Sequence, residues 1–457
     1  MIDAANDALP APRAAPTRKR WSGYQFYLVV VVTLVSVCNT MDRGIMSLLQ
    51  EAIKKDLTLS DAQLGLISGP AFALFYSLAG FPVARLAERY HRPKLLSLAL
   101  AFWSAMTAFC GAVNGFVSLA LLRAGVGIGE GGANPVSHSL LADQFPVRQR
   151  GVAMAVLSAA SPIAKIIVPV TAGIAAYAWG WRATFVVLAV PGFLLALLMW
   201  FGVRDPRHAT TTKVAAGTFA ADSRWLFTNR AFIFVFLAAA FNGIGIQGTG
   251  IFTTSFFIRG HDLTIADAGG IISLFGLASL LGTIIGGYAA DRFGDARGRS
   301  YVLVPAVGAV LSFLLYSLGF RLASLPAAIV VLFGANLSSE IKNGPHFAAV
   351  QNIVSSRMRA TAAAYFFFAA TVIGTGLGAM FVGGLSDHFA RRAFAGDYGH
   401  LCAGGHGVAS AGAAVNQACA AAAANGLQGA LSIVPLTFIA AAACFWLASR
   451  TIRINEE

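Results

Sequence analysis

Long apolar stretches dominate the chain, and polar residues gather in short segments between them. A helix that crosses the roughly 30 Å hydrocarbon core of a bilayer needs about 20 mostly apolar residues. The pattern therefore predicts an all-α membrane protein with twelve transmembrane helices, arranged as two pseudo-symmetric six-helix bundles. The predicted spans cover residues 24–48, 62–84, 95–113, 116–140, 152–177, 183–203, 231–257, 266–290, 300–320, 326–352, 361–386 and 427–449.

Composition and charge agree with this interpretation. The chain is 57% hydrophobic and 12% charged, whereas a soluble domain carries about 25% charged residues. If the N-terminus is cytoplasmic, about two thirds of the Lys and Arg residues fall in cytoplasmic tails and loops, and about a fifth fall outside. This bias predicts a multi-pass protein of the cell membrane, as in a bacterial inner membrane, with both termini cytoplasmic. The net charge of +13 then reflects topology, and no nucleic-acid partner is expected.

A basic, polar connection at residues 204–230 divides the chain into two bundles, residues 24–203 and 231–449. Residues 1–23 and 450–457 form the predicted cytoplasmic tails. The bundles repeat each other, because "GIGEGGANP" in the fourth span matches "LSSEIKNGP" in the tenth and pairs Glu130 with Glu340. Internal repeats of this size are typical of secondary transporters that bind their substrate at mid-membrane.

The loop after the eighth span carries Gly287, Asp291, Arg292 and Gly294, in a spacing that resembles the signature of the major facilitator superfamily. The loop after the second span keeps the charges of that signature as Glu88 and Arg89. Within the superfamily, the chain resembles the Spinster-like lipid transporters. That resemblance rests on "NTMDR", "LSDAQLGLISGPAFALFYSLAGFPVARLAER" and "RAGVGIGEGGANPVSHSLLADQFPVRQRG". The anion–cation symporter branch also has a Gly-Glu pair at the position of Gly129 and Glu130.

The resemblance implies a transporter that works by alternating access, with spans one, four, seven and ten around a central cavity. The implied cargo is an amphiphilic anion such as a lysophospholipid or a phosphorylated sphingoid base, moved in exchange for or together with protons. A small organic anion, such as a sugar acid or an aromatic acid, is the second cargo class that fits. A channel, a non-transporting sensor and a lipid-acting membrane enzyme fit the sequence less well. An enzyme is not expected, because no nucleophile–base arrangement or metal-ligand cluster is recognisable in the sequence.

Charged residues at membrane depth are the strongest functional signal. Each costs about 2.5–3.5 kcal/mol at the bilayer centre, so they must be paired or hydrated. Counting residues along each span predicts an outer tier near the external surface and a central tier in which Glu130 pairs with Lys165 and Glu340 pairs with Lys342. The outer tier consists of Asp42, Arg43 and Arg123.

These residues have predicted roles in transport. Asp42 and Glu130 are the candidate proton carriers, because a carboxylate near both an apolar wall and a cation has an easily shifted pKa. The candidate substrate-binding residues are Arg43, Arg123, Lys165, Asn242, Gln247, Glu340 and Lys342. The family resemblance implies that Glu88, Arg89, Asp291 and Arg292 form a latch when the cytoplasmic side is shut. No cofactor or metal is expected, the bilayer is the main partner, and we expect a monomer.

The external loop between the last two spans, residues 387–426, is unusually long for a helix connection. It is rich in Ala and Gly and holds Cys402 and Cys419, and we expect it to have little order of its own. External placement permits a disulfide between these two cysteines. We therefore predict a Cys402–Cys419 bridge rather than two free thiols.

Overall fold

A computed structural model describes residues 21–205, 219–294, 298–355, 358–408 and 412–452. Every regular element within these ranges is helical. The N-terminal half contains α1 (Gly23–Leu57), α2 (Asp61–Ser68), α3 (Pro70–Arg89), α4 (Arg92–Cys110), α5 (Phe116–Glu130), α6 (Ala133–Gln144), α7 (Val147–Ser158) and α8 (Ala160–Gly202). The linker holds α9 (Phe219–Leu226). The C-terminal half contains α10 (Arg230–His261), α11 (Ile265–Arg292), α12 (Ser300–Gly319), α13 (Leu325–Glu340), α14 (Asn343–Ile353), α15 (Arg359–Phe368), η2 (Ala369–Leu377), α16 (Gly378–Ala393), α17 (Tyr398–Leu401), η3 (Ala403–Gly405), α18 (Ala413–Ile433) and α19 (Leu436–Thr451).

Eleven helical stretches of the described residues are long and apolar enough to cross a membrane. One of them, Val152–Gly202, has 51 residues and would be about 77 Å long as a straight helix, more than twice the thickness of a hydrocarbon core. Gly180 breaks its helical geometry with a φ of 79°, a conformation that favours glycine. The stretch therefore contains the predicted fifth and sixth spans, and the eleven stretches supply twelve crossings.

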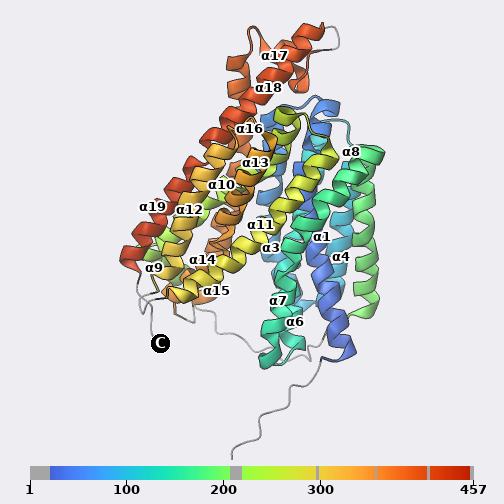
Figure 1. Cartoon of the computed structure of the whole chain (residues 1–457). Helices are drawn as coiled ribbons and strands as arrows, with labels where there is room; N and C mark the ends of the chain where they lie inside the picture. Colours follow the sequence, from blue (N-terminus) through green and yellow to red (C-terminus); the bar gives the residue numbers. More distant parts are fainter. Residues whose placement is uncertain (1–20, 206–218, 295–297, 356–357, 409–411, 453–457) are drawn as a thin grey trace, which may run out of the picture.

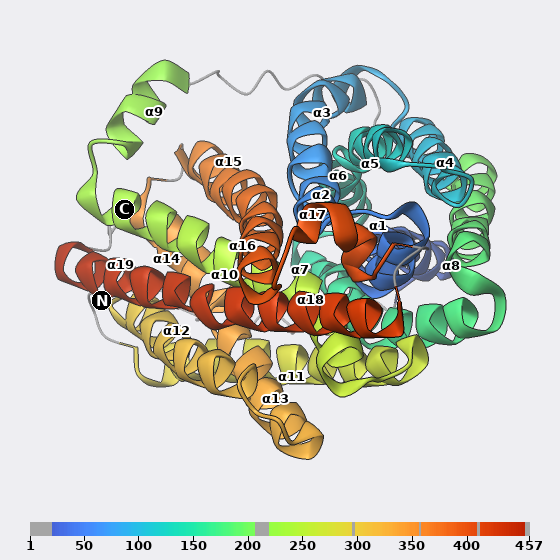
Figure 2. The ribbon, with the colours of Figure 1, turned by 90° about the horizontal axis from the view of Figure 1, so that it is seen from above.

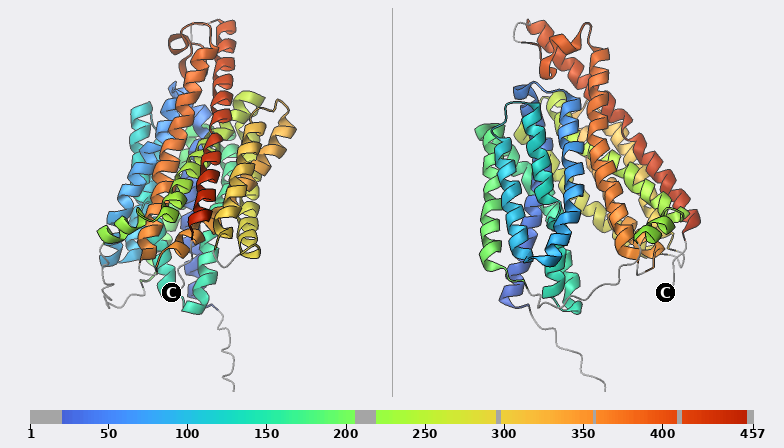
Figure 3. Two further views of the ribbon diagram at one scale, coloured as in Figure 1. Left: turned by 90° about the vertical axis from the view of Figure 1, so that its left-hand side faces the viewer. Right: turned by 180° about the vertical axis from the view of Figure 1, so that it is seen from behind.

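The two halves lie side by side, and the helices of the C-terminal half are inclined to those of the N-terminal half (Figures 1 and 2). Helix α1 begins and α19 ends at the same end of the molecule, where α3 and α11 also end (Figures 1 and 3). We call this the basic end, because Arg89 and Arg292 close the last turns of α3 and α11 there. The opposite end, which carries Cys402 and Cys419, is called the disulfide end.

Backbone-to-backbone packing joins the two halves toward the disulfide end. A Cβ atom on Gly69, at the start of α3, would lie 2.6 Å from the carbonyl oxygen of Gly376 in η2. A Cβ atom on Gly173 of α8 would lie 3.0 Å from the carbonyl oxygen of Ile265 of α11. Only glycine permits such an approach between helices. Toward the basic end the halves diverge (Figure 3).

The structure corrects the prediction for residues 387–426. Helix α16 continues to Ala393 and α18 begins at Ala413, so much of this segment is helical and extends past the other helices (Figure 1). Alanine is the strongest helix former, which explains why "ACAAAAANG" extends the last helix instead of forming a loop. The resulting hairpin covers the disulfide end.

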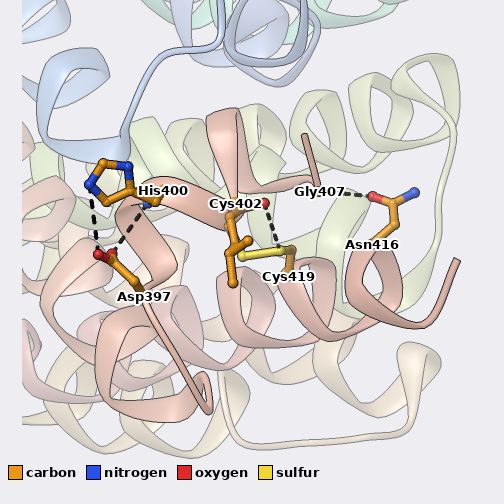
Figure 4. Close-up of a disulfide and its surroundings, with 7 residues drawn as sticks. Asp397, His400, Cys402, Gly407, Asn416 and Cys419 are labelled. Atoms are coloured by element: carbon orange, nitrogen blue, oxygen red, sulfur yellow. Dashed lines mark hydrogen bonds and ion pairs between the residues drawn. A yellow bond between two sulfur atoms is a disulfide. The ribbon is translucent and has the colours of Figure 1, made fainter. Parts of the chain in front are cut away.

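The hairpin has a small core of its own. Cys402 and Cys419 form a disulfide, as the sequence analysis predicts (Figure 4). Both cysteines are buried with Tyr398 and Ala390. Burial lowers the pKa of His406 below its usual value, and the nearby Lys55 lowers it further, so this histidine is neutral at pH 7.

Candidate functional site

A cavity of about 370 Å³ lies between the two halves. Helices from both halves line it, including α1, α5 and α8 on one side and α10, α11 and α13 on the other. Five of the predicted substrate-binding residues line this cavity: Arg43, Arg123, Lys165, Gln247 and Glu340. These five side chains therefore lie together between the halves, and their role in binding stays a prediction.

An ion pair between Arg43 and Glu130 forms the N-terminal side of the site. The Arg43 Nε atom donates to Glu130 Oε2 at 3.2 Å, and the amide of Asn39 donates to the same oxygen at 3.1 Å. Asn39 also accepts a hydrogen bond from Arg43 at 2.8 Å. Glu130 is completely buried, whereas the Arg43 side chain is 36% exposed and faces the cavity. The cation is thus accessible to cargo, and its carboxylate partner is not.

Aromatic rings hold the two arginines in place. The Arg43 guanidinium lies 4.5 Å from the ring centre of Tyr76 and 5.4 Å from that of Phe72, within the range of cation–π attraction. Arg123 contacts the same Phe72 ring at 5.1 Å. Gly127 permits this arrangement, because a Cβ atom there would lie 2.7 Å from the carbonyl oxygen of Phe72. Gly127 therefore serves close packing of α5 against α3, whereas Gly125 and Gly129 face residues of α4.

Asp42 lies behind the cavity, in the N-terminal half. It is 3% exposed, and its carboxylate accepts a hydrogen bond from the hydroxyl of Thr107 at 3.1 Å. Arg123 donates to the backbone carbonyl of Asp42 at 3.1 Å. Asp42 and Arg123 of the predicted outer tier therefore contact each other. Arg43, the third member, instead pairs with Glu130 of the predicted central tier.

The predicted pairing of Lys165 with Glu130 is wrong. The Lys165 Nζ atom instead lies 2.8 Å from Glu340 Oε1, across the boundary between the halves. Lys342 lies 3.9 Å from the other carboxylate oxygen of Glu340. The predicted Glu340–Lys342 pair is therefore present, but it is longer than the Lys165–Glu340 pair. Depth along a helix can be counted from sequence, but the direction of a side chain around the helix decides which half it contacts.

A second cavity of about 460 Å³ adjoins the first. Lys165, Ile246, Gln247 and Glu340 line both, so the cavities meet at these side chains. Most of the remaining wall is apolar or aromatic, with Phe347, Phe366, Phe367, Ala239, Gly243 and Ala370 beside Lys342, Asn343 and His346. The three phenylalanine rings contact one another with centroid distances of 5.4 to 5.7 Å. A charged compartment therefore adjoins an aromatic one.

Asn242 and the predicted latch residues whose side chains are described do not take part in the site in this structure. Asn242 is 1% exposed and lines neither cavity, contrary to the prediction. Arg89 and Arg292 are exposed, and Asp291 accepts a hydrogen bond at 3.0 Å from Tyr301 of its own half. The side chain of Glu88 lies outside the described part of the structure. The latch thus stays a prediction for a state with the basic end shut.

A charged network that the sequence analysis missed closes the disulfide end. Arg259 of α10 donates to both oxygens of Glu51, at 2.9 and 2.6 Å, and to both oxygens of Asp61, at 2.7 Å each. Lys54 contributes a further bond to Asp61 at 2.7 Å. The carboxylate of Asp387, from α16, accepts the backbone N–H groups of Asp61 and Ala62 at the start of α2.

The sequence does carry a signal for this network. A capping box formed by Ser60 and Gln63 starts α2, and Asp61 lies in its first turn. The sequence thus places an acidic residue at a helix start, where the helix dipole favours one. What the sequence lacks is the partner, because Arg259 and Asp387 come from the other half, about 200 and about 330 positions later, and only folding brings them together.

Comparison with known proteins identifies the family of this chain. Residues 32–379 match the model of the Major Facilitator Superfamily. An MFS-type efflux pump of Mycolicibacterium smegmatis is 33% identical over 397 residues, which cover 84% of this chain and 88% of that protein. Protein spinster homolog 1 of Xenopus laevis is 27% identical over 67% of this chain and 62% of its own. A probable L-galactonate transporter of Escherichia coli is 31% identical over 41% of each chain.

Solved structures give the same result. The crystal structure of a bacterial homolog to the human lysosomal transporter Spinster, in an inward-facing and unoccupied conformation, superposes with a TM-score of 0.82 and 28% identity. The alignment covers 96% of this chain and all of that one. The nucleoside transporter NupG shares the fold, with a TM-score of 0.73 and 13% identity. The chain therefore belongs to the Major Facilitator Superfamily and is a multi-pass membrane transporter that resembles the Spinster-like branch.

Proposed function

We propose that this protein is a proton-coupled secondary transporter of an amphiphilic anion, a lysophospholipid or a phosphorylated sphingoid base. The observation that carries the proposal is the junction of the two cavities. Arg43, Arg123 and Lys165 line the first cavity and suit a phosphate or carboxylate head group. Phe347, Phe366 and Phe367 line the second and suit an apolar tail.

The geometry also suggests how cargo and protons are coupled. An anionic head group that binds Arg43 competes with Glu130 for the same guanidinium. A fully buried carboxylate that loses its cation is strongly destabilised as an anion, so Glu130 then takes up a proton. When cargo leaves, Arg43 returns to Glu130 and the proton is released. In this scheme the protein lies in the cell membrane with its basic end toward the cytoplasm. A single monomer carries out the whole transport cycle.

A small organic anion is the second candidate cargo, and some of the relatives support it. Relatives of the chain include a probable L-galactonate transporter and a probable galactarate/D-glucarate transporter of Bacillus subtilis, which is 26% identical over 66% of this chain. A sugar acid would use the same cations and leave the aromatic cavity empty. The two candidates therefore differ in whether the second cavity contributes to binding.

Binding to purified protein distinguishes the two cargo classes. We expect oleoyl lysophosphatidic acid to bind and D-glucarate not to bind, as measured by isothermal titration calorimetry in detergent. Arg43→Lys keeps the charge but loses the planar fork, so affinity for the lysolipid should fall about 10-fold. Arg182→Lys is the control, because Arg182 pairs with Asp56 at an exposed position away from the cavities.

Each outcome is informative. Binding of D-glucarate alone would replace the lipid proposal with the organic-anion one, and binding of neither compound would overturn both. Unchanged lysolipid affinity in Arg43→Lys would remove this arginine from the head-group site.

A pH gradient tests the coupling. In proteoliposomes, Glu130→Gln should abolish lysolipid transport driven by the gradient, because the side chain can no longer exchange a proton. Exchange of labelled for unlabelled lysolipid without a gradient should continue. Asp42→Asn is measured alongside, since Asp42 is also buried near Arg123. Full gradient-driven transport by both variants would exclude these carboxylates as proton carriers.

A further inference from the structure

Lys165 and Glu340 form an ion pair with an unusual position. Lys165 belongs to α8 of the N-terminal half, and Glu340 belongs to α13 of the C-terminal half. Of the ion pairs between described residues, this one both joins the halves and lines the cavity. Any group that draws Lys165 away from Glu340 therefore removes a bond between the halves.

The two partners differ in exposure. The Lys165 side chain is 43% exposed, whereas that of Glu340 is 7% exposed. An anion in the cavity can therefore approach Lys165 directly, while Glu340 stays in the wall. Cargo competes for the cation of this pair in the same manner as it competes for Arg43.

Glu340 keeps other partners when Lys165 leaves. The amide of Asn343 donates to its Oε2 atom at 2.5 Å, and Lys342 lies 3.9 Å from the same oxygen. Lys342 in turn donates to Asn343 at 3.0 Å, so its ammonium already lies beside the carboxylate. A short movement of Lys342 would replace the lost cation. Among the described residues, Glu130 has no such replacement cation, because Arg43 alone lies within ion-pair distance of its carboxylate.

We propose that Lys165 and Lys342 exchange roles at Glu340 when cargo binds. The acidic head group takes Lys165, Lys342 closes on Glu340, and the bond between the halves is lost at little cost because every charge stays paired. Binding of the anion thereby frees the halves to move, which ties occupancy of the cavity to alternating access. This inference rests on the anionic cargo of the proposed function and adds Lys165 and Lys342 as the residues that connect cargo to movement.

Distances between the halves test the bond without cargo. Spin labels at Leu86→Cys of α3 and Tyr288→Cys of α11 report on the basic end, because both sites are exposed and on opposite halves. The three free native cysteines are buried. We expect Lys165→Met to broaden the distance distribution of the ligand-free protein by electron–electron double resonance. Lys342→Met is the matched control and should leave the ligand-free distribution unchanged, since it keeps the Lys165–Glu340 pair.

Oleoyl lysophosphatidic acid tests the exchange. In the labelled wild type it should broaden the distribution as Lys165→Met does without ligand. In Lys342→Met this response should be lost and affinity should fall about 10-fold, because releasing Lys165 would leave Glu340 without a cation. Lys165→Met should also bind about 10-fold more weakly.

The outcomes separate this inference from the proposed function. A ligand-free distribution in Lys165→Met equal to that of wild type overturns the bond between the halves. Normal lysolipid binding and response in Lys342→Met overturn the exchange and leave the proposed function intact. Absence of lysolipid binding in wild type overturns the proposed cargo and the exchange that rests on it, while the ligand-free distances still decide whether Lys165 ties the halves.

Discussion

Replacement of Arg259 by Met should open the disulfide end of the transporter. Arg259 is 8% exposed in its side chain and neutralises both Glu51 and Asp61. Removing one partner of a buried ion pair costs about 3–5 kcal/mol, because the remaining charge is left uncompensated. Here Glu51 loses its cation, whereas Asp61 keeps Lys54. Opening this end hydrates the two carboxylates and relieves that cost, so the equilibrium should shift by roughly 10²- to 4 × 10³-fold toward the open form.

A buried cysteine reports this opening. Ser255 of α10 is fully buried and accepts a hydrogen bond from Gln50 of α1, so it lies between the halves near the disulfide end. In a Ser255→Cys background, a charged thiol reagent should modify Arg259→Met rapidly and the parent slowly. Arg182→Met is the control, since its pair with Asp56 is 41% and 46% exposed and a surface pair contributes at most ~1 kcal/mol. Protection of the cysteine in Arg259→Met would show that this network does not hold the end shut.

The sequence predicts much of this architecture because membrane helices follow a simple rule. Each span must hide its backbone and expose apolar side chains, so its length and position can be read from hydrophobicity alone. The two halves, the twelve crossings and the ionisable residues at depth follow from that rule and from the repeat around Glu130 and Glu340. The disulfide follows from the predicted topology, because two cysteines in one segment that is predicted to be external have few other partners.

The partners of the charges could not be predicted in the same manner. Counting residues places Lys165, Glu130 and Glu340 at one depth, and it gives no information on which of the two carboxylates Lys165 faces. Hydrophobicity places Arg259 in an external loop, whereas α10 continues to His261 and carries this side chain between two carboxylates of the other half. Contacts between halves depend on how two bundles dock, and that geometry changes as the transporter works.

Two adjacent glycines of α16 provide a test of closure that involves no charge. A methyl group on Gly383 would overlap with the carbonyl oxygen of Asp61 in the other half, whereas a methyl group on Gly384 would meet nothing within 4 Å. Gly383 is buried and Gly384 is exposed, although they are neighbours on one helix. Alanine raises helix propensity equally at both sites, so the pair differs in the contact alone.

We expect Gly383→Ala to prevent the disulfide end from closing and Gly384→Ala to behave as wild type. An added methyl in a tightly packed contact costs about 1–3 kcal/mol, and here the backbone of α2 cannot move aside as a flexible side chain could. The closed form should therefore lose about 5- to 150-fold in population, and lysolipid transport in proteoliposomes should fall with it. Both halves keep their own cores, because the clash arises only where they meet, so thermal unfolding of the two variants should be similar. If Gly383→Ala transports at the wild-type rate and keeps Ser255→Cys protected, the close approach of α16 to α2 is not required for closure, and the charged network around Arg259 would have to hold the end by itself.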